Sequence, residues 1–130
     1  MKRFLKAPGI FATPGQPHAL AHGQVFKRVL IGAQVGADPA GNVPEGLEAQ
    51  FALAFDNLLA VIGAVQLNAG DLIKITAFVA VPGSRQLYQS IFERKIGGAT
   101  PLLTYVEIAG LGDPRWLVSL EGEAIQEVSP

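Results

Sequence analysis

Residues 44–79 read PEGLEAQFALAFDNLLAVIGAVQLNAGDLIKITAFV, and this stretch decides the fold. In its first part, apolar side chains recur every three or four positions, which places them on one side of a helix over residues 44–67. These positions are Leu47, Phe51, Ala54, Phe55, Leu58, Ile62 and Val65. The polar side of this helix is narrow, whereas a surface helix usually exposes about half of its circumference to water. We therefore expect this helix, with Pro44 at its first position, to contact more than one layer of the protein.

A strand is predicted directly after this helix. Asn68-Ala69-Gly70 supplies the left-handed stop that often ends a helix. Residues 72–79 are rich in β-branched and aromatic side chains, which favour a strand. One face of this strand carries Ile73, Ile75, Ala77 and Val79, and the other carries Leu72, Lys74, Thr76 and Phe78. Because both faces are mostly apolar, we expect both to be covered, and in a chain this short a second subunit can supply one cover.

The composition indicates one domain over residues 1–130 that buries apolar surface between subunits. The chain is long enough to form a core without disulfides. Hydrophobic residues make up 49% of it and charged residues 16%, whereas about 25% charged residues is usual for soluble domains. This low charge predicts that part of the apolar surface lies at a subunit interface.

The same composition excludes several function classes. A net charge of −1 with scattered Lys and Arg does not predict a nucleic-acid-binding face. Without cysteine there is no disulfide, thiol nucleophile or thiolate metal site. The N-terminus lacks the apolar run of a signal peptide, and the uncharged segment at residues 57–69 is too short to span a membrane. We expect a cytoplasmic protein with no cofactor, no nucleic-acid partner and no membrane contact.

Shorter elements flank this central unit and complete an α+β pattern. A second helix is predicted over residues 85–96, with Ser84 as its cap and Gly97-Gly98 at its end. Strands are predicted at residues 4–5, 19–22, 25–34, 102–108 and 116–126, with a hairpin turn at Gly23-Gln24. This order predicts a mixed sheet with both helices on one face. The face away from the helices is expected to carry Leu72, Leu103, Tyr105 and Leu117, which favours oligomerisation through that face.

Few residues in the chain suit catalysis. His18 and His22 lie four apart in a loop and strand rather than on a helical turn, which does not predict a metal site. No serine lies in a nucleophile elbow. Glu121 and Glu123 share a strand face with Ser119, so they are either an acid–base pair or a solvated face. Arg115, in a loop before Trp116, either anchors a carboxylate ligand or is solvated.

Several short motifs, taken together in order and spacing, resemble one known family. Gly32-Ala33-Gln34-Val35-Gly36 precedes Asp38-Pro39-Ala40-Gly41-Asn42-Val43-Pro44, and Gln50 precedes Asp56-Asn57-Leu58. The run at residues 68–79 completes the pattern. These motifs resemble those of the RidA/YjgF family, also called L-PSP endoribonucleases or translation-inhibitor-like proteins, and the resemblance covers residues 17–124.

The resemblance implies a chorismate-mutase-like fold and a homotrimer. In such a trimer the three sheets form a central barrel, the helices lie outside, and three clefts lie between subunits. Active family members hydrolyse reactive enamines or imines to keto acids and ammonia in these clefts. An arginine holds the substrate carboxylate there, because its planar guanidinium matches a carboxylate with two hydrogen bonds.

This chain departs from the family pattern at the positions that bind substrate. Leu103, in Pro101-Leu102-Leu103, stands where the resemblance implies the arginine, and His18 replaces the tyrosine of Gly-Pro-Tyr. Ser119 falls where many active members carry a glutamate, Glu121 matches the next one, and Gln89 stands near a helix asparagine. Each lost charge-assisted bond costs about 1.5–3 kcal/mol of binding. The usual deaminase activity is therefore not expected.

The leading hypothesis is a RidA-like homotrimer that binds a small metabolite in its intersubunit clefts. Leu103, Tyr105 and Phe92 would make each cleft apolar, and His18, Gln89, Ser119, Arg115 and Glu121 are the candidate polar contacts. If the protein hydrolyses a related molecule, Glu121 or His18 is the proton-transfer group. One alternative is an enamine or imine deaminase in which Arg115 or Arg85 of a neighbouring subunit replaces the missing arginine. Another is a protein-binding or chaperone-like trimer without catalysis.

Overall fold

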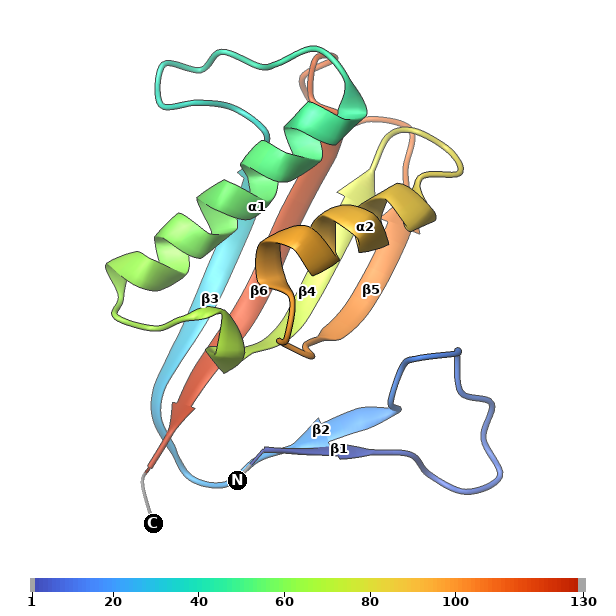
Figure 1. Cartoon of the computed structure of the whole chain (residues 1–130), viewed down its shortest axis with the longest axis vertical. Helices are drawn as coiled ribbons and strands as arrows, with labels where there is room; N and C mark the ends of the chain where they lie inside the picture. The colour runs from blue at the N-terminus through green and yellow to red at the C-terminus, as the bar shows by residue number, and fades with distance from the viewer. Residues whose placement is uncertain (1, 129–130) are drawn as a thin grey trace.

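The computed structural model describes residues 2–128 and contains two helices, six strands and one short 3-10 helix (Figure 1). In chain order these are β1 (Arg3–Leu5), β2 (Ala19–Ala21), β3 (Val25–Val35), α1 (Leu47–Ala64), η1 (Ala69–Asp71), β4 (Leu72–Val79), α2 (Arg85–Ile96), β5 (Leu102–Glu107) and β6 (Val118–Glu127). The bounds of α2 and β4 agree with the sequence-based prediction, and the other predicted strands differ at their ends by one or two residues.

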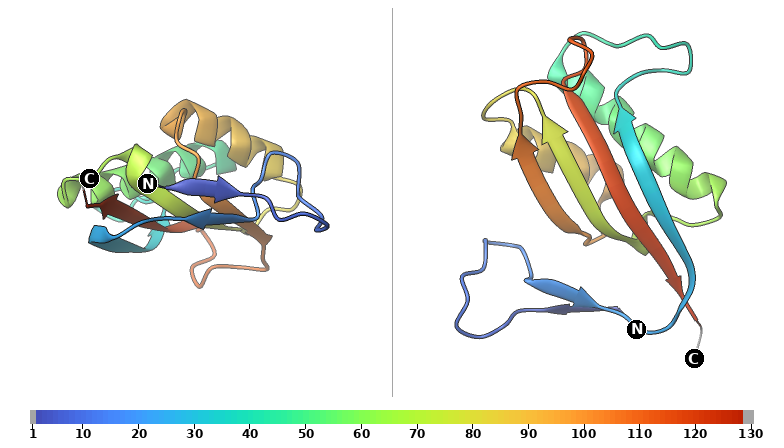
Figure 2. Two further views of the ribbon diagram at one scale, coloured as in Figure 1. Left: turned by 90° about the horizontal axis from the view of Figure 1, so that it is seen from below. Right: turned by 180° about the vertical axis from the view of Figure 1, so that it is seen from behind.

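The main sheet has four strands in the order β3-β6-β4-β5. β4 and β5 run parallel, and the other neighbouring pairs are antiparallel. Both helices lie on one face of this sheet, and within residues 2–128 no layer covers the opposite face (Figure 2, right). The predicted α+β architecture, a mixed sheet with two helices on one side, is confirmed.

The core lies between the two helices and β4, at the centre of the sheet. Ile75, Ala77 and Val79 of β4 are completely buried, as their shared face predicts. From α1, the side chains of Phe51, Ala54, Phe55, Leu58 and Ile62 fill the same layer. By length and composition α1 would also pass as a membrane span, a test that the core helix of a folded domain passes too. Here α1 packs on the sheet.

The N-terminal strands form a small separate sheet, so the predicted hairpin at Gly23-Gln24 is wrong. β2 pairs with β1, with Leu5 opposite Ala19, and it does not pair with β3. Gly23-Gln24 instead leads the chain from the small sheet to the edge of the main one. There the backbone N–H of Gly23 donates to Glu127, and the N–H of Val128 donates to the Gln24 carbonyl.

Both ends of α1 differ in detail from the prediction. The helix begins at Leu47 after Gly46, whose φ of 91° suits only glycine well, so Pro44 lies outside the helix. At the other end, the left-handed residue is Gln66, at φ 59°, rather than Asn68-Ala69-Gly70. Asn68 instead caps η1, where its side chain and that of Asp71 bond reciprocally to the backbone.

Leu72, Leu103 and Tyr105 lie on the helix side of the sheet, which corrects the prediction that they belong to the open face. Because β5 pairs in parallel with β4, Leu103 lies beside Ile75 and Tyr105 beside Ala77. A register shift after Leu72 turns this residue into the core. When both faces of a strand are apolar, its sequence does not indicate which face points toward the core. The prediction for these three residues was wrong for this reason.

Gln50 links the start of α1 to the loop that precedes β6. Its side chain is almost completely buried, and its Nε2 donates to the carbonyls of Pro44 and Arg115. Its Oε1 accepts the N–H of Leu117 at 2.9 Å. The Gln50 side chain therefore satisfies three backbone groups at one end of the sheet. The backbone of Gly36 also packs against Gln50, so closely that a Cβ added to Gly36 would stand 2.5 Å from the Gln50 carbonyl oxygen.

We predict that Gln50→Leu destabilises the protein by about 2–4 kcal/mol, because it leaves these partly buried backbone groups without partners. The free energy of unfolding from urea denaturation measures the effect. Gln86→Leu, at an exposed position of α2, is the matched control and should change stability by less than about 0.5 kcal/mol. Equal effects of the two substitutions would show that the Gln50 hydrogen bonds contribute little.

Candidate ligand-binding cavity

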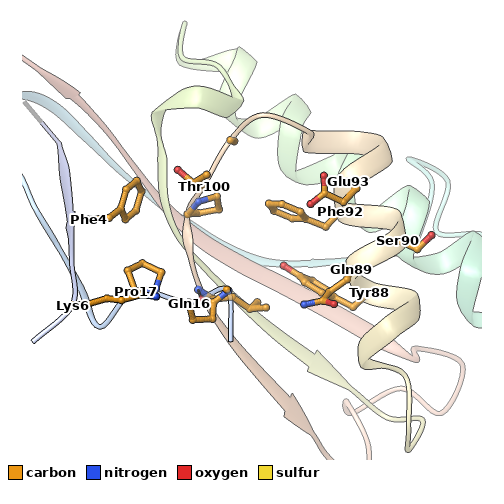
Figure 3. Close-up of a pocket in the computed structure, with 14 residues that line it drawn as sticks. Phe4, Lys6, Gln16, Pro17, Tyr88, Gln89, Ser90, Phe92, Glu93 and Thr100 are labelled. Atoms are coloured by element: carbon orange, nitrogen blue, oxygen red, sulfur yellow. Dashed lines mark hydrogen bonds between the residues drawn. The ribbon is translucent and has the colours of Figure 1, made fainter. Parts of the chain in front are cut away.

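A cavity of about 710 Å³ lies between α2, the start of β5 and the segment that precedes β2 (Figure 3). Among the residues that line it are Gln16, Pro17, Tyr88, Gln89, Phe92 and Leu103. Tyr88 and Phe92 are four residues apart on α2, so they lie on one helix face and extend together toward the N-terminal segment. Gln16 joins this segment to β5, because its Oε1 accepts the N–H of Leu103 at 3.4 Å.

The cavity brings together three of the residues predicted from the sequence to bind a ligand: Leu103, Gln89 and Phe92. Leu103 comes from β5, and the other two come from α2. Tyr105, another of the predicted residues, lies two residues beyond Leu103 on the same face of β5. Its ring packs edge-on against Tyr88, with ring centroids 5.9 Å apart. Tyr105 therefore packs against Tyr88, a residue of the cavity wall, and is not itself among the residues that line the cavity.

Tyr105 also belongs to a polar cluster at the N-terminus of α2. Its hydroxyl donates to Glu107 at 3.0 Å, and the guanidinium of Arg85 lies 5.6 Å from the centre of its ring. The same Glu107 oxygen accepts the N–H of Gly83 and Ser84. The Tyr105 hydroxyl in particular holds the pKa of Glu107 below its usual value. Burial, and to a lesser extent this hydrogen bond, raises the pKa of Tyr105.

The side chain of Glu107, rather than that of Ser84 as predicted, accepts hydrogen bonds from the backbone N–H groups just before α2. Ser84 occupies the N-cap position, but its hydroxyl donates to the Val81 carbonyl at 2.7 Å. An acceptor that arrives from a strand more than twenty residues away leaves no local signature, so sequence reasoning missed this contact.

Glu121 and Ser119 lie on the opposite face of the sheet from the cavity. Glu121 lines a smaller hollow of about 260 Å³ together with Lys74 and Thr76. Glu123, next along the same face, forms an ion pair with Arg28 at 3.0 Å. Ser119 is buried beside Phe78. The predicted common face of Ser119, Glu121 and Glu123 is confirmed, but within one chain the sheet separates them from Leu103.

His18 holds the loop between β1 and β2 in place. Its Nδ1 accepts the N–H of Ala7 at 2.8 Å, which leaves Nε2 as the protonated nitrogen that donates to the Phe11 carbonyl at 2.8 Å. Both ring nitrogens are therefore used by the backbone. Pro17 lines the cavity, while His18 at the next position serves the loop.

Arg115 lies in the loop between β5 and β6 and is paired locally. Its Nε and Nη2 both bond to the carboxylate of Asp113, at 3.1 Å and 2.8 Å. This contact lowers the pKa of Asp113. The guanidinium thus has a bidentate partner inside its own loop, and Arg115 is not among the residues that line the cavity.

Sequence reasoning missed two residues of the cavity. The helical spacing of Tyr88 is typical of a core residue, and Gln16 lies in a loop rich in proline and glycine, so neither position signals a cavity in the sequence. The spacing of Tyr88 and Phe92 is compatible with either a core or a cavity wall, so only the position of the N-terminal segment distinguishes the two. Within residues 2–128, no three His, Asp or Glu side chains gather in a way that could hold a metal ion.

Comparison with known proteins identifies the family of this chain. The family model described as Endoribonuclease L-PSP matches residues 18–126. No curated protein matches the sequence.

Solved structures share the fold over nearly the whole chain. YyfB, a Rid-family protein from Yersinia pestis, has a TM-score of 0.82 at 19% identity, over 96% of this chain and 98% of its own. The YjgF gene product of E. coli has a TM-score of 0.70 at 23% identity, over 95% and 94%. E. coli TdcF, whose structure contains bound serine, has a TM-score of 0.67 at 25% identity, over 91% and 98%. The chain belongs to the endoribonuclease L-PSP family, the family of RidA and YjgF.

Proposed function

We propose that this protein is a homotrimer that binds a small metabolite in its intersubunit clefts and is not a standard 2-imino-acid deaminase. One observation carries the proposal: Leu103, at the position implied for the substrate-binding arginine, lies in the wall of the 710 Å³ cavity. A carboxylate placed against a leucine loses its charge-assisted hydrogen bonds, each worth about 1.5–3 kcal/mol. The ligand is therefore expected to differ from an amino-acid-derived imine.

The open face of the sheet supports the trimer. Leu30 on β3 points away from the helices and is 66% exposed, and the neighbouring Phe26 is 71% exposed. Phe78, Leu102 and Val106 share this face through their registers with β6 and β5. Large apolar side chains gathered on one sheet face are typical of a protein–protein interface. In a barrel of three such sheets they would be buried.

Deaminase chemistry is the second candidate function, and the position of Arg85 favours it. Its guanidinium lies over the ring of Tyr105, two residues along β5 from Leu103, and no carboxylate partner of Arg85 is found among residues 2–128. Arg85 is thus a better substitute for the missing arginine than Arg115, which Asp113 already holds. E. coli TdcF with bound serine shows that a relative of this fold takes an amino acid.

For the assembly, we predict a trimer by light scattering coupled to size exclusion, and we predict that Leu30→Glu shifts it toward monomer. A charge at this site would be buried against other subunits at a large desolvation cost. Ala60→Glu, on the exposed side of α1, is the control and should remain trimeric. A wild-type monomer, or a Leu30→Glu trimer as stable as the wild type, would contradict the proposed assembly.

For the activity, we predict that the wild type releases little ammonia from freshly generated 2-aminoacrylate and that Leu103→Arg gains turnover by about tenfold or more. The gain corresponds to at least one charge-assisted hydrogen bond to the substrate carboxylate. Leu103→Met is the control, because it is long and uncharged and should stay inactive.

The same assay separates the alternatives. Wild-type turnover at the level of active family members, abolished by Arg85→Gln, would replace the main proposal with the deaminase. Inactivity of every variant, including Leu103→Arg, would favour the protein-binding or chaperone-like alternative.

A further inference from the structure

Tyr88 carries a hydroxyl group that the fold itself does not use. The residue is 2% exposed, and its hydroxyl oxygen is buried without a hydrogen-bond partner among residues 2–128. Its ring packs against the rings of Phe51, Phe55, Phe92 and Tyr105 at centroid distances of 5.6–6.0 Å. A phenylalanine would keep all of these ring contacts. The hydroxyl therefore adds a desolvation cost and no packing.

The position of this hydroxyl offers a reason for its presence. Buried polar groups in proteins almost always have partners, so an unpartnered one needs a specific explanation. Tyr88 is part of the cavity wall, and its side chain extends from α2 toward the segment that carries Gln16 and Pro17 (Figure 3). A ligand in the cavity can thus supply the missing partner.

The surroundings of Tyr88 define which ligand group fits. Burial raises the pKa of Tyr88, so the phenol is neutral and acts chiefly as an O–H donor. Phe92 and Leu103, which line the cavity with it, are apolar. Lys6 and Glu93 also line the cavity, but both are exposed and their opposite charges offset each other, so together they give no net preference for an anion inside.

We propose that the Tyr88 hydroxyl donates a hydrogen bond to the ligand of this cavity, and that the ligand is a neutral, mostly apolar molecule with one strong acceptor such as a carbonyl oxygen. The inference rests on the proposed function, because it requires a cavity that binds small molecules. It specifies the chemical class of the ligand and the residue that recognises it.

A pair of probes that differ only in the acceptor tests this assignment. Acetophenone has a carbonyl where ethylbenzene has a methylene group, and the two are similar in size. We expect wild type to bind acetophenone more tightly than ethylbenzene in ligand-observed NMR titrations. Tyr88→Phe should weaken acetophenone binding about 3- to 10-fold, the usual effect of one neutral hydrogen bond, and leave ethylbenzene binding unchanged.

Thermal unfolding of the free protein provides a second readout. Because the hydroxyl has no hydrogen-bond partner among the described residues, Tyr88→Phe should keep or raise the Tm. Ser84→Ala removes a hydroxyl that does have a partner, the Val81 carbonyl, and should lower the Tm. Loss of binding together with unchanged or greater stability would identify a hydroxyl retained for the ligand.

Three results would overturn the inference. Equal binding of acetophenone by wild type and Tyr88→Phe would show that the Tyr88 hydroxyl does not bond to the ligand, without contradicting the proposal that the cavity binds a metabolite. A Tm of Tyr88→Phe as low as that of Ser84→Ala would show that the hydroxyl has a structural partner. If neither probe binds wild type at millimolar concentration, the ligand class is wrong, and the proposed function is then judged by the Leu103 variants alone.

Discussion

The burial of one face of β4 under two helices is the constraint on which the rest of the structure depends. Ile75, Ala77 and Val79 are sealed there by α1 and α2, and β5 and β6 take their registers from the same strand. Burying these apolar groups is the main favourable term in folding. Once β4 is in place, Leu103 must lie beside Ile75, which positions the cavity wall directly against the core. The site is thus an extension of the core, where the layer of aromatic rings meets the N-terminal segment.

The fold could be predicted from the sequence because its signals are local, and the site could not because its decisive contacts are distant. Helical spacing in α1 and α2 and the β-branched run of β4 specify the elements, and the motifs around Gly36 and Asn57 specify the family. The face on which Leu103 and Tyr105 lie was predicted wrongly, since β5 is apolar on both sides and only its parallel pairing with β4 decides the question. Likewise, the capping of α2 by Glu107 joins residues more than twenty positions apart.

Apart from His18 and Arg115, which lie in loops, the predicted site residues divide between the two faces of one sheet. Leu103, Gln89 and Phe92 lie on the helix side, whereas Glu121 and Ser119 lie on the open side. A single site that includes both groups would require strands from two subunits, which agrees with the clefts implied by the family resemblance. Within one chain, the cavity that Leu103 lines also contains aromatic rings and amides. The carboxylates that could transfer a proton therefore lie on the open face of the sheet, whereas the cavity that could hold a ligand lies on the helix side.

The N-terminal sheet has a consequence for how the cavity behaves over time. Among residues 2–128, β1 and β2 pair with each other and not with the main sheet. The segment before β2 contacts the main body through the Gln16 bond to Leu103, and the residue before β1 does so through the bond from Lys2 Nζ to the Gly70 carbonyl. A unit that lies outside the main sheet can open without global unfolding. Its amides should therefore exchange with solvent hydrogen faster than those of β4. Ligand affinity would then include the free energy of closing this wall, so a substitution far from the cavity could weaken binding while leaving the core intact.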